Sequence, residues 1–307
     1  MAKIPLSVII PTYNRVELLK KCLHSLFNQT LPKHQYEIII IDDGSTDNTQ
    51  KILYQTAAEA PVSFKFFKHE NKGPGAARNV GIKEAQGEIV FFTGDDIIAT
   101  ENLLKEHLDF HKKYHDVAVL GRIKWHPDID VTDFMKYIMI SGYQFGYEKI
   151  KDPMDLSYGY FYTSNISLPK SWFDRAGYFD EDFPYASFED IELGYRMEKK
   201  GLRIIYNKGA LAYHMHIVDL KSFCERQRKA GESGYIFYLK HPEIASTIGV
   251  GRSRLERNLR ILFFRILSTI FKLVRFRKGY YSSQLLYFYS LGVKQRCLIS
   301  PGNPGVK

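Results

Sequence analysis

Two adjacent aspartates, Asp95 and Asp96, follow an apolar segment at residues 89–92. Two ionised carboxylates cannot both enter an apolar core without partners, because each carries a large desolvation cost. At the carboxyl end of a buried parallel strand they would face the sheet edge where α/β proteins bind ligands. Carboxylate oxygens suit Mg²⁺ or Mn²⁺, which in turn hold a diphosphate. The alternative is a pair of solvated turn residues.

A second acidic pair, Asp42 and Asp43, follows the predicted strand at 37–41 and precedes Gly44. Glycine permits a sharp turn, and capping and turn formation account for one of the two acids. The other acid suggests a ligand at the same sheet edge.

A third acidic pair, Glu189 and Asp190, opens an amphipathic segment at residues 191–199. Carboxylates are favoured at a helix amino terminus by its dipole, so capping is one explanation. The other is general-base catalysis, since the same dipole would help keep a carboxylate ionised at neutral pH and able to accept a proton.

The segments that would position these side chains alternate between strand and helix patterns. Such alternation predicts a mostly parallel sheet flanked by helices, with polar loops converging at the carboxyl ends of the strands. We expect strands at 7–10, 37–41, 62–68, 89–92 and 117–123, and helices at 16–28, 46–58, 76–85, 102–114 and 191–199.

Five segments, in this order, resemble the inverting family 2 glycosyltransferases, which have the GT-A fold. The resemblance implies an α/β, Rossmann-like sheet with an acceptor-side region. No GxGxxG or Walker loop marks another nucleotide-binding class. The segments are SVIIPTYNR (7–15), IIIIDDGSTDNT (38–49), NKGPGAARNVGI (71–82), FFTGDDI (91–97) and FEDIELGYRMEKKGLRI (188–204).

The resemblance assigns a nucleotide-binding role to five positions. Pro11 and Tyr13 would border the base, with Tyr13 stacking on it. Asp43 would accept a hydrogen bond from the base N–H, which favours uracil or thymine. Asn71 and Arg78 would hold the nucleotide side of the site. An alternative for Arg78 is a structural ion pair near a helix start.

The resemblance also assigns the metal site and the catalytic base. Asp95 and Asp96 would bind Mn²⁺ or Mg²⁺ and the ribose or sugar, and His214 would complete the metal site; the alternative for His214 is a surface or core histidine. Asp190 would be the base. Thr93 replaces the first acid of the family's DxD motif, which leaves open which aspartate ligates the metal.

The implied activity is a metal-dependent inverting transfer of a sugar from a nucleotide donor, a UDP-sugar, to a glycan or lipid-linked acceptor in polysaccharide or glycoconjugate synthesis. The cation would stabilise the charge of the departing diphosphate. One alternative is a sugar nucleotidyltransferase, although PTYNR is not a glycine-rich phosphate loop. Another is a catalytically silent nucleotide-sugar-binding scaffold at a membrane.

The net charge of +9 is unevenly distributed. Residues 252–296 contain eleven Lys or Arg and one acid, a net of +10, so the rest of the chain sums to −1. A helical pattern at 255–275 places leucines and isoleucines on one face and basic residues on the other. This pattern favours an anionic membrane surface, and the alternative is packing on the catalytic domain. No nucleic-acid-binding motif accompanies the charge, so no nucleic-acid partner is expected.

The sequence predicts three regions: a nucleotide-sugar-binding half at 1–100, an acceptor-binding and catalytic half at 101–218, and a helical basic extension at 219–307. Three cysteines, far apart and odd in number, fit reduced thiols. No segment has the length and apolar character of a transmembrane helix. We therefore expect a cytoplasmic protein that associates peripherally with the inner face of the membrane.

Overall fold

The computed structural model of the chain describes residues 4–299, which form two compact units. The first unit contains every residue predicted for the catalytic site. Within the described residues it comprises 4–131, 139–181 and 189–217, and the second unit comprises 132–138, 182–188 and 218–299.

The first unit is built on one eight-stranded sheet with the order β3-β2-β1-β4-β7-β6-β8-β5. β1 lies parallel to β2 and β4, whereas β7 runs antiparallel to both β4 and β6. The sheet is therefore mixed but mostly parallel. The strands are β1 Leu6–Thr12, β2 Tyr36–Asp42, β3 Ser63–Lys68, β4 Ile89–Thr93, β5 Ile97–Ala99, β6 Val117–Trp125, β7 Asn165–Pro169 and β8 Arg203–His214.

The strand order reverses between β1 and β4. The chain passes from β1 outward to β2 and β3, and then returns to place β4 on the other side of β1. In open α/β sheets the loops diverge at such a reversal and leave a crevice at the carboxyl ends of the strands. The segments PTYN and GDD both begin at this point.

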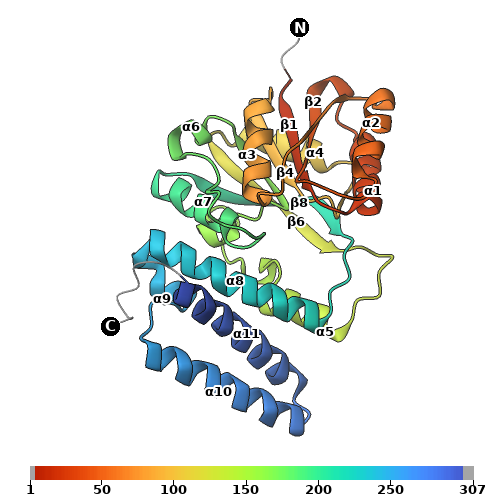
Figure 1. Cartoon of the computed structure of the whole chain (residues 1–307). Coiled ribbons are helices and arrows are strands. Elements are labelled where there is room, and N and C mark those ends of the chain that lie inside the picture. Colours follow the sequence, from red (N-terminus) through yellow and green to blue (C-terminus); the bar gives the residue numbers. More distant parts are fainter. Residues whose placement is uncertain (1–3, 300–307) are drawn as a thin grey trace. The chain divides into compact units, whose positions relative to one another are not determined.

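The central strands are buried on both faces, which explains their nearly continuous apolar sequences. Helix α3 packs closely on β1 and β2 (Figure 1). A Cβ atom at Gly81 would lie 2.8 Å from Ile41 Cδ1, so glycine is needed for this approach. The helices of the sheet unit include α1 Val16–Phe27, α2 Thr49–Glu59, α3 Pro74–Glu84, α4 Leu103–Lys113, α6 Trp172–Ala176 and α7 Glu189–Lys199.

The second unit is helical, and α11 packs against both α8 and α10. Glycines bring α8 and α11 together: a Cβ atom at Gly292 would overlap the backbone oxygen of Arg228. The main helices are α8 Leu220–Lys240, α9 Ala245–Ile248, α10 Arg254–Leu273 and α11 Arg277–Ile299, and α5 Asp133–Ser141 begins in this unit.

The α/β fold and every strand and helix listed from the sequence are confirmed, with ends shifted by up to three residues. The short strands β5 and β7 were not predicted, and for β8 the sequence indicates only a strand pattern in GALAYHMH at 209–216. In the part of the chain that the structure describes, none of the helices combines the length and apolar character that crossing a bilayer requires.

Candidate active site

Asp95 lies at the strand reversal, where the loop after β4 meets the end of β1. Its carboxylate is 5% exposed and accepts a hydrogen bond of 2.8 Å from Thr12 Oγ1. Burial and the negative charge of Asp96 raise the pKa of Asp95 to about 6. The buried strand therefore delivers one carboxylate into the crevice and holds it in a fixed position.

Asp96 contacts a residue that is far from it in the sequence. His214, the last residue of β8, places Nε2 3.3 Å from Asp96 Oδ2. This proximity follows from the antiparallel register of β5 and β8, which pairs Ile97 with His214. Burial alone would raise the pKa of Asp96, but the charges of His214 and Arg15 outweigh it and lower that pKa.

Arg15 bridges the two aspartates. Its Nη1 atom lies 3.2 Å from Asp95 Oδ1 and 2.9 Å from Asp96 Oδ2. A single guanidinium thus contacts both carboxylates and offsets part of their negative charge. Arg15 was not predicted from the sequence as a site residue, although it is the last residue of the PTYNR segment.

The donor set of Asp95, Asp96 and His214 fits a divalent cation. Two carboxylates and one imidazole are suitable ligands for Mn²⁺ or Mg²⁺ completed by phosphate and water. The ring nitrogen nearest to the carboxylates is His214 Nε2, and His214 Nδ1 is buried without a hydrogen-bond partner. Within residues 4–299, however, no three acidic, histidine or cysteine side chains already converge into a formed metal cluster.

Asp43 is placed by the loop that precedes α3. Its two carboxylate oxygens accept hydrogen bonds from the backbone N–H groups of Lys72, at 2.9 Å, and Gly73, at 3.1 Å. Gly73 has φ of 90°, a conformation that favours glycine. Asp43 thus fixes the loop beside Asn71, and its remaining lone pairs are available to a ligand.

The other predicted nucleotide-binding residues differ in exposure. Tyr13, after β1, is 46% exposed, and Asn71 is also exposed. Arg78 is buried, and its Nη1 lies 2.9 Å from Glu189 Oε1. Arg78 therefore forms the ion pair that was the alternative to nucleotide contact. Pro11, within β1, is partly buried.

Asp190 lies in the first turn of α7, immediately after Glu189. Its Oδ2 accepts long hydrogen bonds of 3.4 Å from the backbone N–H and hydroxyl of Thr163. Burial raises the pKa of Asp190, and the charge of Arg78 opposes this. Burial and the charge of Asp190 raise the pKa of Glu189 to about 7. Thr163 was not identified from the sequence.

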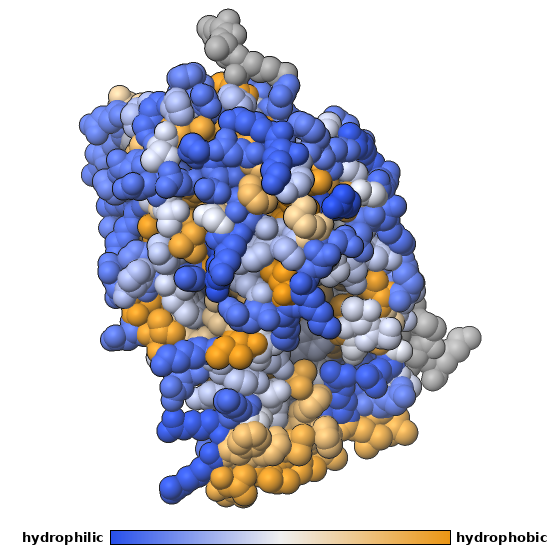
Figure 2. All heavy atoms as spheres, turned by 180° about the vertical axis from the view of Figure 1, so that it is seen from behind, coloured by the Kyte–Doolittle hydropathy of each residue, from blue (hydrophilic) through white to orange (hydrophobic). Residues whose placement is uncertain are grey.

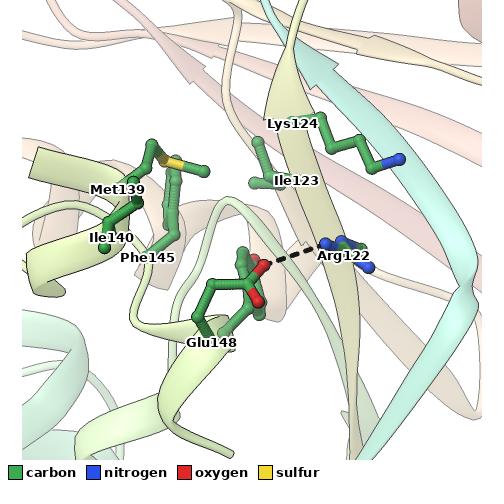
Figure 3. A pocket seen from close by; sticks show the side chains of 8 residues that line it. Arg122, Ile123, Lys124, Met139, Ile140, Phe145 and Glu148 are labelled. Carbon is green, nitrogen blue, oxygen red and sulfur yellow. Dashed lines mark hydrogen bonds and ion pairs between the residues drawn. The ribbon is translucent and has the colours of Figure 1, made fainter. Parts of the chain in front are cut away.

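A pocket of about 340 Å³ opens beside β6 (Figure 3). Phe145 in its wall also contacts His214, with ring centroids 5.9 Å apart. Arg122 on the opposite side pairs with Glu148 at 3.1 Å. The pocket therefore adjoins the Asp96–His214 pair. Its lining comprises Arg122, Ile123, Lys124, Met139, Ile140, Phe145, Tyr147 and Glu148.

Known proteins resemble this chain in sequence and in fold. The profile described as Glycosyl transferase family 2 matches residues 7–178. Over 144 residues the chain is 39% identical to a poly(ribitol-phosphate) beta-glucosyltransferase of Bacillus spizizenii, covering 42% of this chain and 23% of that protein. The chain spans less than two thirds of the length of the curated relatives that it matches.

Two solved structures share the fold. Staphylococcus aureus TarS 1-349 in complex with UDP-GlcNAc has a TM-score of 0.56 and 21% identity, covering 95% of this chain and 91% of that one. The mannosyltransferase PcManGT of Pyrobaculum calidifontis, in complex with GDP-Man and Mn²⁺, has a TM-score of 0.58 and 18% identity, covering 96% and 75%.

Proposed function

Because the chain belongs to glycosyl transferase family 2, we propose that it is an inverting glycosyltransferase that moves a sugar from a nucleotide donor, a UDP-sugar, to a glycan or lipid-linked acceptor. The observation that supports this most is the contact between Asp96 and His214 at the strand reversal, next to the buried carboxylate of Asp95. His214 is 118 residues from Asp96 in the sequence, yet the two side chains lie 3.3 Å apart.

The donor would bind across this crevice. Tyr13 would stack on the base, Asp43 would accept its N–H, and Pro11 and Asn71 would line the nucleotide. Asp95, Asp96 and His214 would hold Mn²⁺ or Mg²⁺, which supplies positive charge to the departing diphosphate. Arg15 has to release at least one aspartate for an ion to bind, and the freed guanidinium can then contact phosphate.

Asp190 would act as the general base. It removes the proton of the acceptor hydroxyl while that oxygen attacks the anomeric carbon. The new carbon–oxygen bond forms as the bond to the diphosphate breaks, so configuration inverts and the nucleoside diphosphate leaves. The raised pKa strengthens Asp190 as a base. Arg78 pairs with Glu189, and its positive charge offsets the negative charge of the neighbouring carboxylates Glu189 and Asp190.

The pocket beside β6 would receive part of the acceptor. Phe145 and Met139 offer an apolar wall for the C–H face of a sugar, and Arg122 and Lys124 offer positive charge. A lipid-linked acceptor would place the enzyme at a membrane surface. The three cysteines are free and buried, which supports an intracellular, reducing location.

The proposal is tested by nucleotide release from a panel of UDP- and GDP-sugars with Mn²⁺ or Mg²⁺. We expect UDP release from one donor, and its loss in Asp190→Asn. Asp174→Asn, which changes an exposed acid on α6, is the matched control and should keep wild-type activity. Nucleotide binding without release from any donor would support the silent scaffold instead. Pyrophosphate release would support the nucleotidyltransferase.

A further inference from the structure

Helix α10 packs inside the second unit through only one of its faces. Ser268 on this face is 4% exposed and bonds to Gln284 of α11, and Arg260 Nε donates to Ser290 of α11 at 3.3 Å. Helix α11 therefore covers this side of α10.

The other face of α10 carries a row of large apolar side chains that the described chain leaves exposed. We call this row the α10 stripe. Successive members are three or four positions apart, apart from one adjacent pair, so they share one side of a 20-residue helix about 30 Å long. They are 45–77% exposed: Leu255, Leu259, Leu262, Phe263, Ile266, Ile270 and Leu273.

The α10 stripe is not a feature that an isolated soluble protein needs. Single exposed apolar residues are ordinary, but a continuous row of this length marks a surface that binds something. Figure 2 shows hydrophobic residues gathered at the bottom of the view, where α10 is drawn in Figure 1. The helix begins with a capping box between Ser253 and Glu256, which fixes its first turn without a partner.

Charge identifies the partner. Basic residues at Arg254, Arg265 and Lys272 border the stripe on one side, and the acid of α10, Glu256, is engaged in the capping box. Residues 252–296 contain eleven basic residues and one acid. A second copy of the chain would bring two regions of net +10 together, whereas anionic lipid headgroups would neutralise them.

We propose that the α10 stripe docks on an anionic lipid bilayer, with its apolar side chains in the boundary between headgroups and acyl chains. The long stems of Arg265 and Lys272 would lie along the helix while their charged ends reach the headgroups. Vesicle binding requires neither donor nor catalysis. Its failure is therefore distinguishable from failure of the proposed transferase activity.

The first test is co-sedimentation of the full chain with vesicles of phosphatidylcholine alone or with about 30% phosphatidylglycerol. We expect binding to the anionic vesicles that weakens with salt. Replacing Leu259, Phe263 and Ile266 together by serine should weaken it at least about tenfold. The matched control, Tyr54→Ser with Ile217→Ser, changes equally exposed side chains outside α10 and should bind like the wild type.

A second variant measures insertion of α10 into the bilayer while keeping the α10 stripe apolar. Tryptophan at position 263 (F263W) should show blue-shifted emission with anionic vesicles, and Tyr54→Trp should not. Equal binding by the serine variant and the wild type would overturn the proposal, as would absence of wild-type binding. A concentration-dependent dimer that the serine changes abolish would assign the stripe to a second copy instead.

Discussion

The guanidinium of Arg78 lies 2.9 Å from the carboxylate of Glu189, and both side chains are buried. The contact joins α3, beside the proposed nucleotide loop, to α7, which carries the proposed base. One cation therefore compensates two neighbouring carboxyls, Glu189 and Asp190, and burial with the Asp190 charge raises the pKa of Glu189 to about 7.

The first prediction concerns the charge beside the base. Glu189→Gln removes a negative neighbour, so the pKa of Asp190 should fall. The base acts when ionised, and the rise of kcat/KM with pH should therefore begin at lower pH than in the wild type. A pH profile checks this. Glu192→Gln on the same helix, whose partner is Arg196, is the control and should leave the profile in place.

The second prediction concerns Arg15, which contacts both Asp95 and Asp96, the proposed metal ligands. Arg15→Gln should raise the affinity for Mn²⁺ without nucleotide about fivefold, because a competing charge is removed. Titration followed by electron paramagnetic resonance measures it. Lys20→Gln is the control, since that cation on α1 has the same 43% exposed side chain but pairs with Glu17. Unchanged affinity would contradict the competition.

The proposed metal ligands are tested by Asp96→Asn and His214→Ala. Each should weaken Mn²⁺ binding in the presence of UDP by about tenfold or more. The control is another histidine–aspartate pair outside the proposed ligand set, His126 and Asp128, whose Nδ1 and Oδ2 atoms are 3.6 Å apart. Asp128→Asn should bind Mn²⁺ as the wild type does. Equal affinities in all variants would remove His214 and Asp96 from the ligand set.

Tyr13 tests the nucleotide side of the site. Tyr13→Ala should weaken UDP binding about tenfold, because stacking of a base on an aromatic ring contributes about 1–3 kcal/mol. Calorimetric titration measures the change. Tyr54→Ala removes another exposed tyrosine and should have no effect, so a similar loss in both variants would point to a general structural cause.

The fifth prediction concerns the pH dependence of folding. His107 is fully buried between Ser167 and Asn165, and burial lowers its pKa to about 4. The unfolded chain therefore binds this proton more tightly, and His107 costs stability as the pH falls below about 6.5. Between pH 7.5 and pH 5 this loss is about 2 kcal/mol by linkage.

The measurement for His107 is urea unfolding at both pH values. His107→Gln should lose about 2 kcal/mol less than the wild type over this interval. His24→Gln, which changes an exposed histidine on α1, serves as the control and should follow the wild type. If His107→Gln and the wild type lose stability equally, protonation of His107 does not contribute.

The sequence by itself determined the local elements and the carboxylates that they carry. Short continuous apolar runs between turn signals favour strands buried on both faces, and helical periodicity indicated the intervening helices. Asp95, Asp96 and Asp190 could be selected as candidate site residues because they stand at the ends of these elements. Their assigned roles in binding and catalysis stay predictions.

Only the tertiary structure shows which side chains contact these residues. Arg15 reaches Asp95 across 80 positions, and Arg78 meets Glu189 across 111, which no local pattern encodes. The register of β5 on β8 brings His214 to Asp96. On α10, periodicity revealed two dissimilar faces, but only the packing of α11 determined which face is covered, because burial depends on neighbours distant in the sequence.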